Sequence, residues 1–183
     1  SASPRIRSSL KGMEMSIQNV LKNMWQDYLV LNPEAQRVVD TLLAEGESIV
    51  NDHIALRTFN VGVVALGECA KPFLSMGYEE KKSYFFEAKK LRARHYEHKA
   101  DPSIPKIFIS ELLVDEFSTE FQDIVSSLVS HISADQVQQS NFFFSGRPWN
   151  VSLSQHETLL KESDYGAWMA AIGYRPNHFT VLI

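Results

Sequence analysis

The order of elements between residues 53 and 114 constrains the fold of this chain more than any other feature. Four short segments have the alternating or continuous apolar pattern of strands, and the segment after the first has helical spacing. In chain order they are a strand at 53–59, a helix at 64–76, and strands at 78–87, 91–98 and 106–114. This βαβββ order predicts an α+β protein, and two such modules can close around a shared cleft as a partly open barrel.

Helices are expected before this module, and further helices between its last strand and the strand at the end of the chain. The second N-terminal helix should start at Pro33 and bury an apolar face formed by Val38, Val39, Leu42 and Leu43. The elements outside the module are helices at 16–31, from 33, 117–132, 155–161 and 164–172, an irregular segment at 141–153 and a strand at 178–183.

We expect a single domain over residues 16–183. Its first module spans about 53–114, and a second begins at about 178, where we expect the natural continuation to be missing. Residues 1–15 contain no apolar stretch, so they are interpreted as a disordered extension or cloning remnant and not as a signal peptide.

The composition narrows the classes of partner. With 18 basic and 22 acidic residues the net charge is −4, which argues against a nucleic-acid surface and favours small molecules. No apolar run approaches the roughly 20 residues that span a bilayer. The single cysteine, Cys69, cannot form an internal disulfide, so a reducing, cytoplasmic location is expected and Cys69 is expected to pack in the core.

Two of the six histidines stand out as metal-ligand candidates. His53 and His178 each begin an apolar strand just after a polar segment, the place where a barrel cleft opens. His131 and His156 are assigned to helix surfaces, and the neighbourhood of His95 is read as a solvated edge strand. Two histidines and a carboxylate would form the facial triad typical of non-haem Fe(II), with positions left for substrate and oxygen.

Charged residues near these strands are candidates for the remaining roles. Glu111 is the best carboxylate for a third ligand, with pairing to a base as the equal alternative and a ligand beyond Ile183 as another. Arg57 lies on the same strand face as His53, because side chains alternate with period two, and a guanidinium binds carboxylates in a fork. Arg175 is a second, weaker candidate for substrate binding.

Four segments together resemble a known family. They are His53–Phe59, Phe86–Ala93, Pro105–Leu112 and Arg175–Thr180, and the likeness runs from about residue 16 to the end. The family is the one once catalogued as domain of unknown function 1338, which includes 2-oxoadipate dioxygenase/decarboxylase, also called 2-hydroxyglutarate synthase.

The resemblance implies a vicinal-oxygen-chelate type fold and an Fe(II) site of two histidines and one glutamate, although another divalent metal can occupy such a site. By motif position His53 and His178 match the metal histidines and Arg57 the arginine for the distal carboxylate, whereas the family glutamate follows the second histidine. The implied reaction uses O2 to convert 2-oxoadipate to 2-hydroxyglutarate and carbon dioxide in lysine breakdown. Two alternatives stay open: a non-catalytic carboxylate-binding or structural module on the same fold, and a metal-dependent hydrolase.

Overall fold

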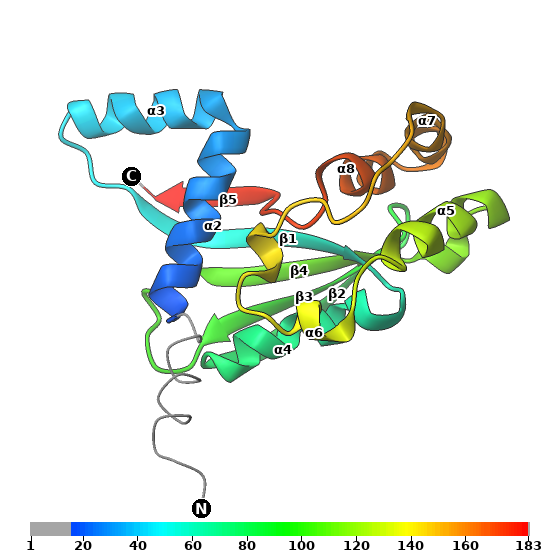
Figure 1. Ribbon diagram of the computed structural model, residues 1–183. Helices are drawn as coiled ribbons and strands as arrows, with labels where there is room; N and C mark the ends of the chain where they lie inside the picture. Colours follow the sequence, from blue (N-terminus) through cyan, green and yellow to red (C-terminus); the bar gives the residue numbers. More distant parts are fainter. Residues whose placement is uncertain (1–15, 183) are drawn as a thin grey trace, which may run out of the picture.

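The computed structural model describes residues 16–182, which form one five-stranded sheet with helices around it (Figure 1). The strand order is β2-β3-β4-β1-β5, in which β1 is parallel to β4 and every other neighbouring pair is antiparallel. The strands are β1 Val50–Phe59, β2 Tyr78–Phe86, β3 Leu91–His98, β4 Lys106–Leu112 and β5 His178–Leu182. The expected extension at residues 1–15 lies outside the described residues.

The βαβββ module is confirmed by the order β1, α4, β2, β3, β4 along the chain. Helix α4 (Leu66–Ser75) begins after a short turn of 3-10 helix, η1 (Gly62–Val64), and Pro72 lies within it. The strand β5 pairs antiparallel with β1 at the edge of the same sheet. The element expected to begin a second module is therefore joined directly to the first.

The other helices occur close to the expected positions. They are α2 Ile17–Leu31, α3 Pro33–Ala44, η2 Val114–Glu116, α5 Thr119–Val129, α6 Ala134–Val137, η3 Phe142–Phe144, α7 Leu153–Glu162 and α8 Asp164–Ile172. Serine side chains accept backbone N–H groups at the starts of α2, α5, α6, α7 and α8, which satisfies donors that a helix cannot pair internally. No helix within residues 16–182 has both the length and the hydropathy to cross a membrane.

The two faces of the sheet differ in what covers them. Ile54 and Leu56 of β1 and Ile107 and Ile109 of β4 are fully buried on one face, on which α2, α4 and α6 lie (Figure 1). We call this the helix-covered face. The side chains that alternate with these, such as His53, Ala55 and Phe108, project from the other face and are only partly buried. We call this the open face.

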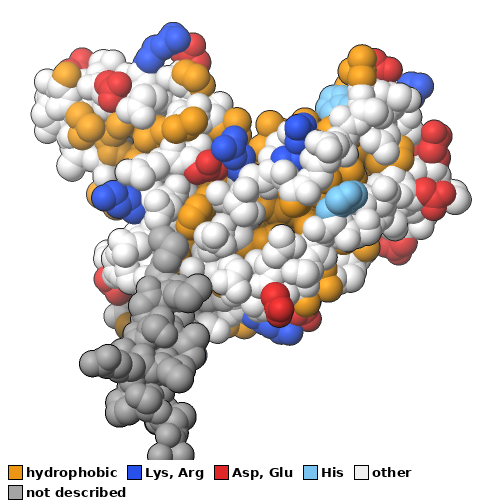
Figure 2. Space-filling view, viewed as in Figure 1, with side chains coloured by type: hydrophobic (Ala, Val, Ile, Leu, Met, Phe, Trp, Pro, Cys, Tyr) orange, Lys and Arg blue, Asp and Glu red, His pale blue; other side chains and the backbone are white. Residues whose placement is uncertain are grey.

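Helix α3 departs from the sequence prediction. None of its residues is buried, and Val38 and Leu43 are 58% and 55% exposed. The helix extends away from the sheet (Figure 1), and Figure 2 shows hydrophobic side chains on the surface of this part of the molecule. The predicted buried face is therefore wrong for the described residues. Helical periodicity identifies an apolar stripe but does not say whether another element packs against it.

Candidate metal and carboxylate site

The two candidate histidines lie on neighbouring strands. In the β1–β5 ladder Ala55 pairs with His178 and His53 pairs with Thr180, so both imidazoles project from the open face. Their ring centroids are 6.4 Å apart. A metal–nitrogen bond is about 2.1 Å, so two rings on opposite sides of one cation have centroids about 6.5 Å apart, and two rings at adjacent positions, as in a facial triad, about 5 Å. The two side chains would therefore have to rotate toward each other to bind one ion in a facial triad.

His53 is oriented as metal-binding histidines usually are. Its Nδ1 lies 3.0 Å from a carboxylate oxygen of Asp52, and its Nε2 lies 2.8 Å from the hydroxyl of Thr180. The contact joins the consecutive residues Asp52 and His53, and the β1–β5 ladder is irregular between Asn51 and His53. The hydrogen bond from His53 lowers the pKa of Asp52. A carboxylate on Nδ1 fixes the tautomer that leaves Nε2 as the ligand, so His53 fits a metal site.

Glu111 does not join the histidines. It faces the helix-covered side, where its Oε2 accepts the backbone N–H of Leu66 at 2.8 Å and its Oε1 accepts a hydrogen bond from Arg92 at 3.3 Å. Its side chain is therefore on the wrong face for the predicted role as third ligand, and the alternative of pairing with a base is the one observed. Within residues 16–182 no group of three possible ligand side chains gathers around one point.

Arg57 lies on the open face near the carboxyl end of β1. Its guanidinium lies 4.5 Å from the ring centroid of Tyr165 and 5.0 Å from that of Trp168, both in α8. No carboxylate within the described part of the chain forms an ion pair with it. Burial lowers the pKa of Arg57, but a guanidinium stays protonated at any pH a protein tolerates. Arg57 is thus a charged group held by two aromatic rings, and it has no carboxylate partner among the described residues.

Arg175 is not part of this arrangement. Its guanidinium forms an ion pair with Asp27 of α2 at 3.0 Å, and burial raises the pKa of that carboxyl. The predicted second substrate arginine therefore fastens α2 to the segment before β5. The polar sequence around Arg175 gave no information about this partner, because α2 lies at the other end of the chain.

His95 and Phe108 are open-face residues that the sequence reasoning missed. Strand β3 lies between β2 and β4 and is not an edge, and in its ladder His95 pairs with Phe108. The two rings stack with centroids 4.5 Å apart, and Phe108 is also 5.2 Å from the ring of His53. Burial lowers the pKa of His95. The alternation along β3 could have placed His95 and Tyr96 on opposite faces of the sheet. It could not have shown that β3 lies in the interior of the sheet.

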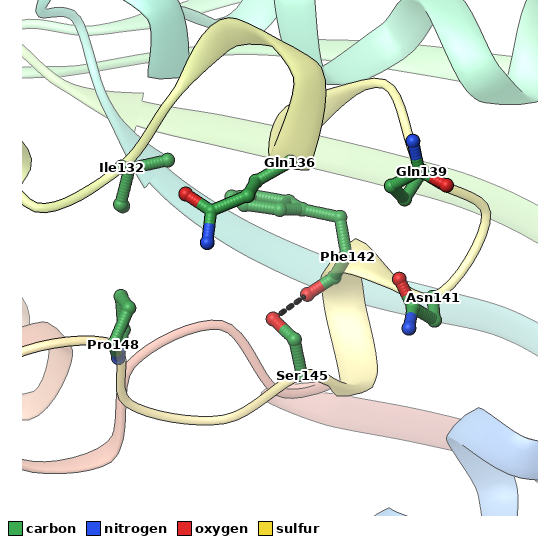
Figure 3. Close-up of a pocket in the computed structure, with 7 residues that line it drawn as sticks. All are labelled: Ile132, Gln136, Gln139, Asn141, Phe142, Ser145 and Pro148. Carbon is green, nitrogen blue, oxygen red and sulfur yellow. Dashed lines mark hydrogen bonds between the residues drawn. The ribbon is translucent and has the colours of Figure 1, made fainter.

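Two cavities differ in chemistry. One, of about 420 Å³, lies on the other side of the molecule, where the amides of Gln136, Gln139 and Asn141 surround Phe142 (Figure 3). Its described lining contains no charged side chain. The other, of about 470 Å³, is lined by Arg57 together with Tyr165, and neither His53 nor His178 is among its lining residues.

Comparison with known proteins shows the family of the chain. The profile of the family described as 2-oxoadipate dioxygenase/decarboxylase matches residues 16–182. The chain is 33% identical to the chloroplastic/amyloplastic 2-oxoadipate dioxygenase/decarboxylase of Oryza sativa, over 93% of the chain and 50% of that protein. It thus spans about half the length of that relative.

Solved structures show the same fold. A putative hydrolase from Shewanella frigidimarina superposes with a TM-score of 0.86 at 47% identity, covering 92% of this chain and 66% of that one. Rice hydroxyglutarate synthase in complex with 2-oxoadipate gives 0.81 at 32% identity, covering 99% and 60%. A putative glyoxalase superfamily protein from Ralstonia eutropha gives 0.71 at 24% identity, covering 90% and 61%, which confirms the predicted fold type. The chain therefore belongs to the 2-oxoadipate dioxygenase/decarboxylase family.

Proposed function

We propose that the protein containing this chain is an Fe(II)-dependent oxygenase that decarboxylates and hydroxylates a 2-oxo acid, most simply 2-oxoadipate. Family membership supports the reaction class, and the similar rice structure holds 2-oxoadipate. The observation that carries the proposal is the histidine pair at 6.4 Å on the same sheet face as an arginine that has no described carboxylate partner. The reaction would belong to lysine breakdown and is expected in the cytoplasm.

His53 and His178 would hold the metal, and Asp52 would keep the His53 ring in position through its Nδ1. The bound iron would supply a centre that chelates the 2-oxo acid and activates O2. The described residues provide two of the three protein ligands that this chemistry usually has. The Thr180 hydroxyl lies 2.8 Å from Nε2 of His53, so it would have to turn away when a metal binds.

Arg57 would bind the far carboxylate of the substrate. Four residues along β1 separate it from His53, which corresponds to about 13 Å between the two Cα atoms. Both side chains extend from the same face, so a dicarboxylate can lie along the strand between them. Phe108, on the neighbouring strand, provides an apolar surface beside His53 that limits access of water. The 2-oxo end would thus be kept at the histidines and the carboxylate end at Arg57.

The reaction balances without a further co-reactant. The bond between C1 and C2 of 2-oxoadipate breaks and carbon dioxide leaves. One oxygen atom of O2 enters the new carboxylate at the former 2-oxo carbon, and the other becomes the hydroxyl group of 2-hydroxyglutarate. The four electrons that reduce O2 come from the oxidative decarboxylation and from the hydroxylated C–H bond of the same molecule.

The test combines oxygen consumption with metal analysis. His53→Ala should lose bound iron and oxygen consumption on 2-oxoadipate, whereas His156→Ala, a histidine on α7, should lose neither. Arg57→Ala should keep its iron and raise KM by at least about tenfold, because a charge-assisted fork to a carboxylate is removed. Full iron content and full turnover in His53→Ala would refute the proposal.

The absence of a three-ligand group within residues 16–182 favours one rival, a carboxylate-binding module that uses Arg57 without a metal. Protein purified without metal and tight dicarboxylate binding would support that rival. A metal-dependent hydrolase, the class to which the Shewanella protein is assigned, would bind metal but consume no oxygen with any 2-oxo acid.

A further inference from the structure

Helix α8 holds Arg57 in an unusual way. The guanidinium lies against the rings of both Tyr165 and Trp168, at 4.5 and 5.0 Å. A cation over an aromatic face is attracted by the ring quadrupole, and more strongly when it is partly desolvated. Arg57 is partly buried, so two flat surfaces restrict a side chain that otherwise has many rotamers. The position of its charge is therefore set by α8.

The hydroxyl of Tyr165 fastens α8 to the strands that carry and flank Arg57. It accepts the backbone N–H of Thr58 at 3.1 Å and lies 2.9 Å from the hydroxyl of Ser110. It also lies 3.1 Å from the carbonyl of Thr58 and 2.9 Å from that of Ser110, either of which can accept its proton. Since Arg57 pairs with Ser110 in the β1–β4 ladder, the phenol binds both strands beside the arginine.

The ends of α8 and its packing hold the helix in place. Ser163 caps its first turn, and Gly173 ends it at a φ of 78°. Gly166 lies so close to Phe121 of α5 that a Cβ would be 2.7 Å from that ring. The aromatic pair is thus mounted on a helix that has little room to shift.

The cavity next to this pair is suited to an anion. It measures about 470 Å³ and is lined by Arg57, by Lys89 and Lys90 of the β2–β3 turn, and by the acids Glu162 and Asp164. One of these, Glu162, is already bound to the backbone N–H and hydroxyl of Ser118, at 3.0 and 2.6 Å. The cation best placed for a ligand is Arg57, because the Nζ of Lys90 donates to a backbone carbonyl.

We propose that Tyr165 and Trp168 are positioning residues that fix the guanidinium of Arg57 and so set the chain length of the dicarboxylate that the site accepts. This inference rests on the proposed function in that it takes the histidine pair as the anchor for the 2-oxo end. With the anchor and the guanidinium both fixed, only one spacing between the two ends of a ligand satisfies both. A mobile arginine would instead accept several lengths with similar affinity.

The test measures dissociation constants by calorimetry, without oxygen, for 2-oxo dicarboxylates of five, six and seven carbon atoms. The wild-type, metal-loaded protein should prefer one length by at least about tenfold, the range that one methylene group can give. In Trp168→Leu and Tyr165→Phe this ratio should fall below about threefold. Tyr78→Phe is the matched control, since it removes one buried phenol hydroxyl far from Arg57 and should keep the wild-type ratio.

Two results would overturn the inference: variants that weaken binding of all three ligands equally and keep the ratio, or a wild-type protein without a length preference. Trp168 is only partly buried, so Trp168→Leu provides the answer if Tyr165→Phe does not fold. Oxygen consumption tests the proposed function separately. A protein that binds with a length preference lost in the variants but consumes no oxygen would support the positioning role and refute the oxygenase.

Discussion

Replacement of Glu111 by alanine separates a structural role from a metal-binding role. The carboxylate is 5% exposed and accepts the N–H of Leu66, the first residue of α4. Leaving that N–H unpaired should cost about 1–3 kcal/mol. Loss of a negative charge at a helix start adds about 0.3–1 kcal/mol. The pair with Arg92, whose side chain is 49% exposed, adds at most about 1 kcal/mol.

The free energy of unfolding should therefore fall by about 1–5 kcal/mol in Glu111→Ala, measured by urea denaturation. For a chain of this size each kcal/mol lowers Tm by about 2–4 °C. Glu111→Gln keeps an acceptor of the same shape, so its loss should be smaller. Both variants should retain the wild-type affinity for iron, measured on protein that is still folded.

Unfolding of Glu111→Ala at the same denaturant concentration as the wild type would contradict the structural role of Glu111. So would a folded Glu111→Ala variant that no longer binds metal while Glu111→Gln does. Either result would mean that the carboxylate serves the open face of the sheet, contrary to its hydrogen bonds.

Three further outcomes are expected. Gly173→Ala puts a Cβ 2.5 Å from a backbone carbonyl oxygen and should cost at least about 2 kcal/mol in urea unfolding, against about 1 kcal/mol for Gly46→Ala, where nothing lies within 4 Å. Burial lowers the pKa of His95, so below about pH 6.5 the unfolded chain binds more protons than the folded protein. The free energy of unfolding should therefore fall on acidification to pH 5. In His95→Gln this dependence on pH should be weaker. Val38→Ser should change the unfolding free energy by less than about 0.5 kcal/mol, whereas Leu128→Ala, buried in α5, should cost about 2–5 kcal/mol.

The strand alternation was sufficient to group side chains but not to orient the groups. It correctly put His53 with Arg57, and the same period of two puts Glu111 on one face with Ile107 and Ile109. It could not say that helices cover the second group, which is why Glu111 was considered for the metal site. The side of a sheet on which helices pack depends on the connection between strands, and one strand alone carries no record of it.

His95 illustrates a second limit. Its mixed, charged surroundings are typical of an edge strand, yet β3 has a neighbour on each side. Strand order depends on contacts between distant segments, and a local composition cannot reveal it. The same limit applies to Arg175, whose partner Asp27 comes from the first described helix.

Local sequence determined the type and order of the elements, because periodicity and capping act within a few residues. It thereby fixed the βαβββ module and the shared face of His53 and Arg57. Only the tertiary structure decided that β5 pairs with β1 and brings His178 to His53, and that α8 closes on Arg57. These contacts join segments more than a hundred residues apart, and they form because burying apolar surface on both sides of the sheet selects one arrangement of strands and helices.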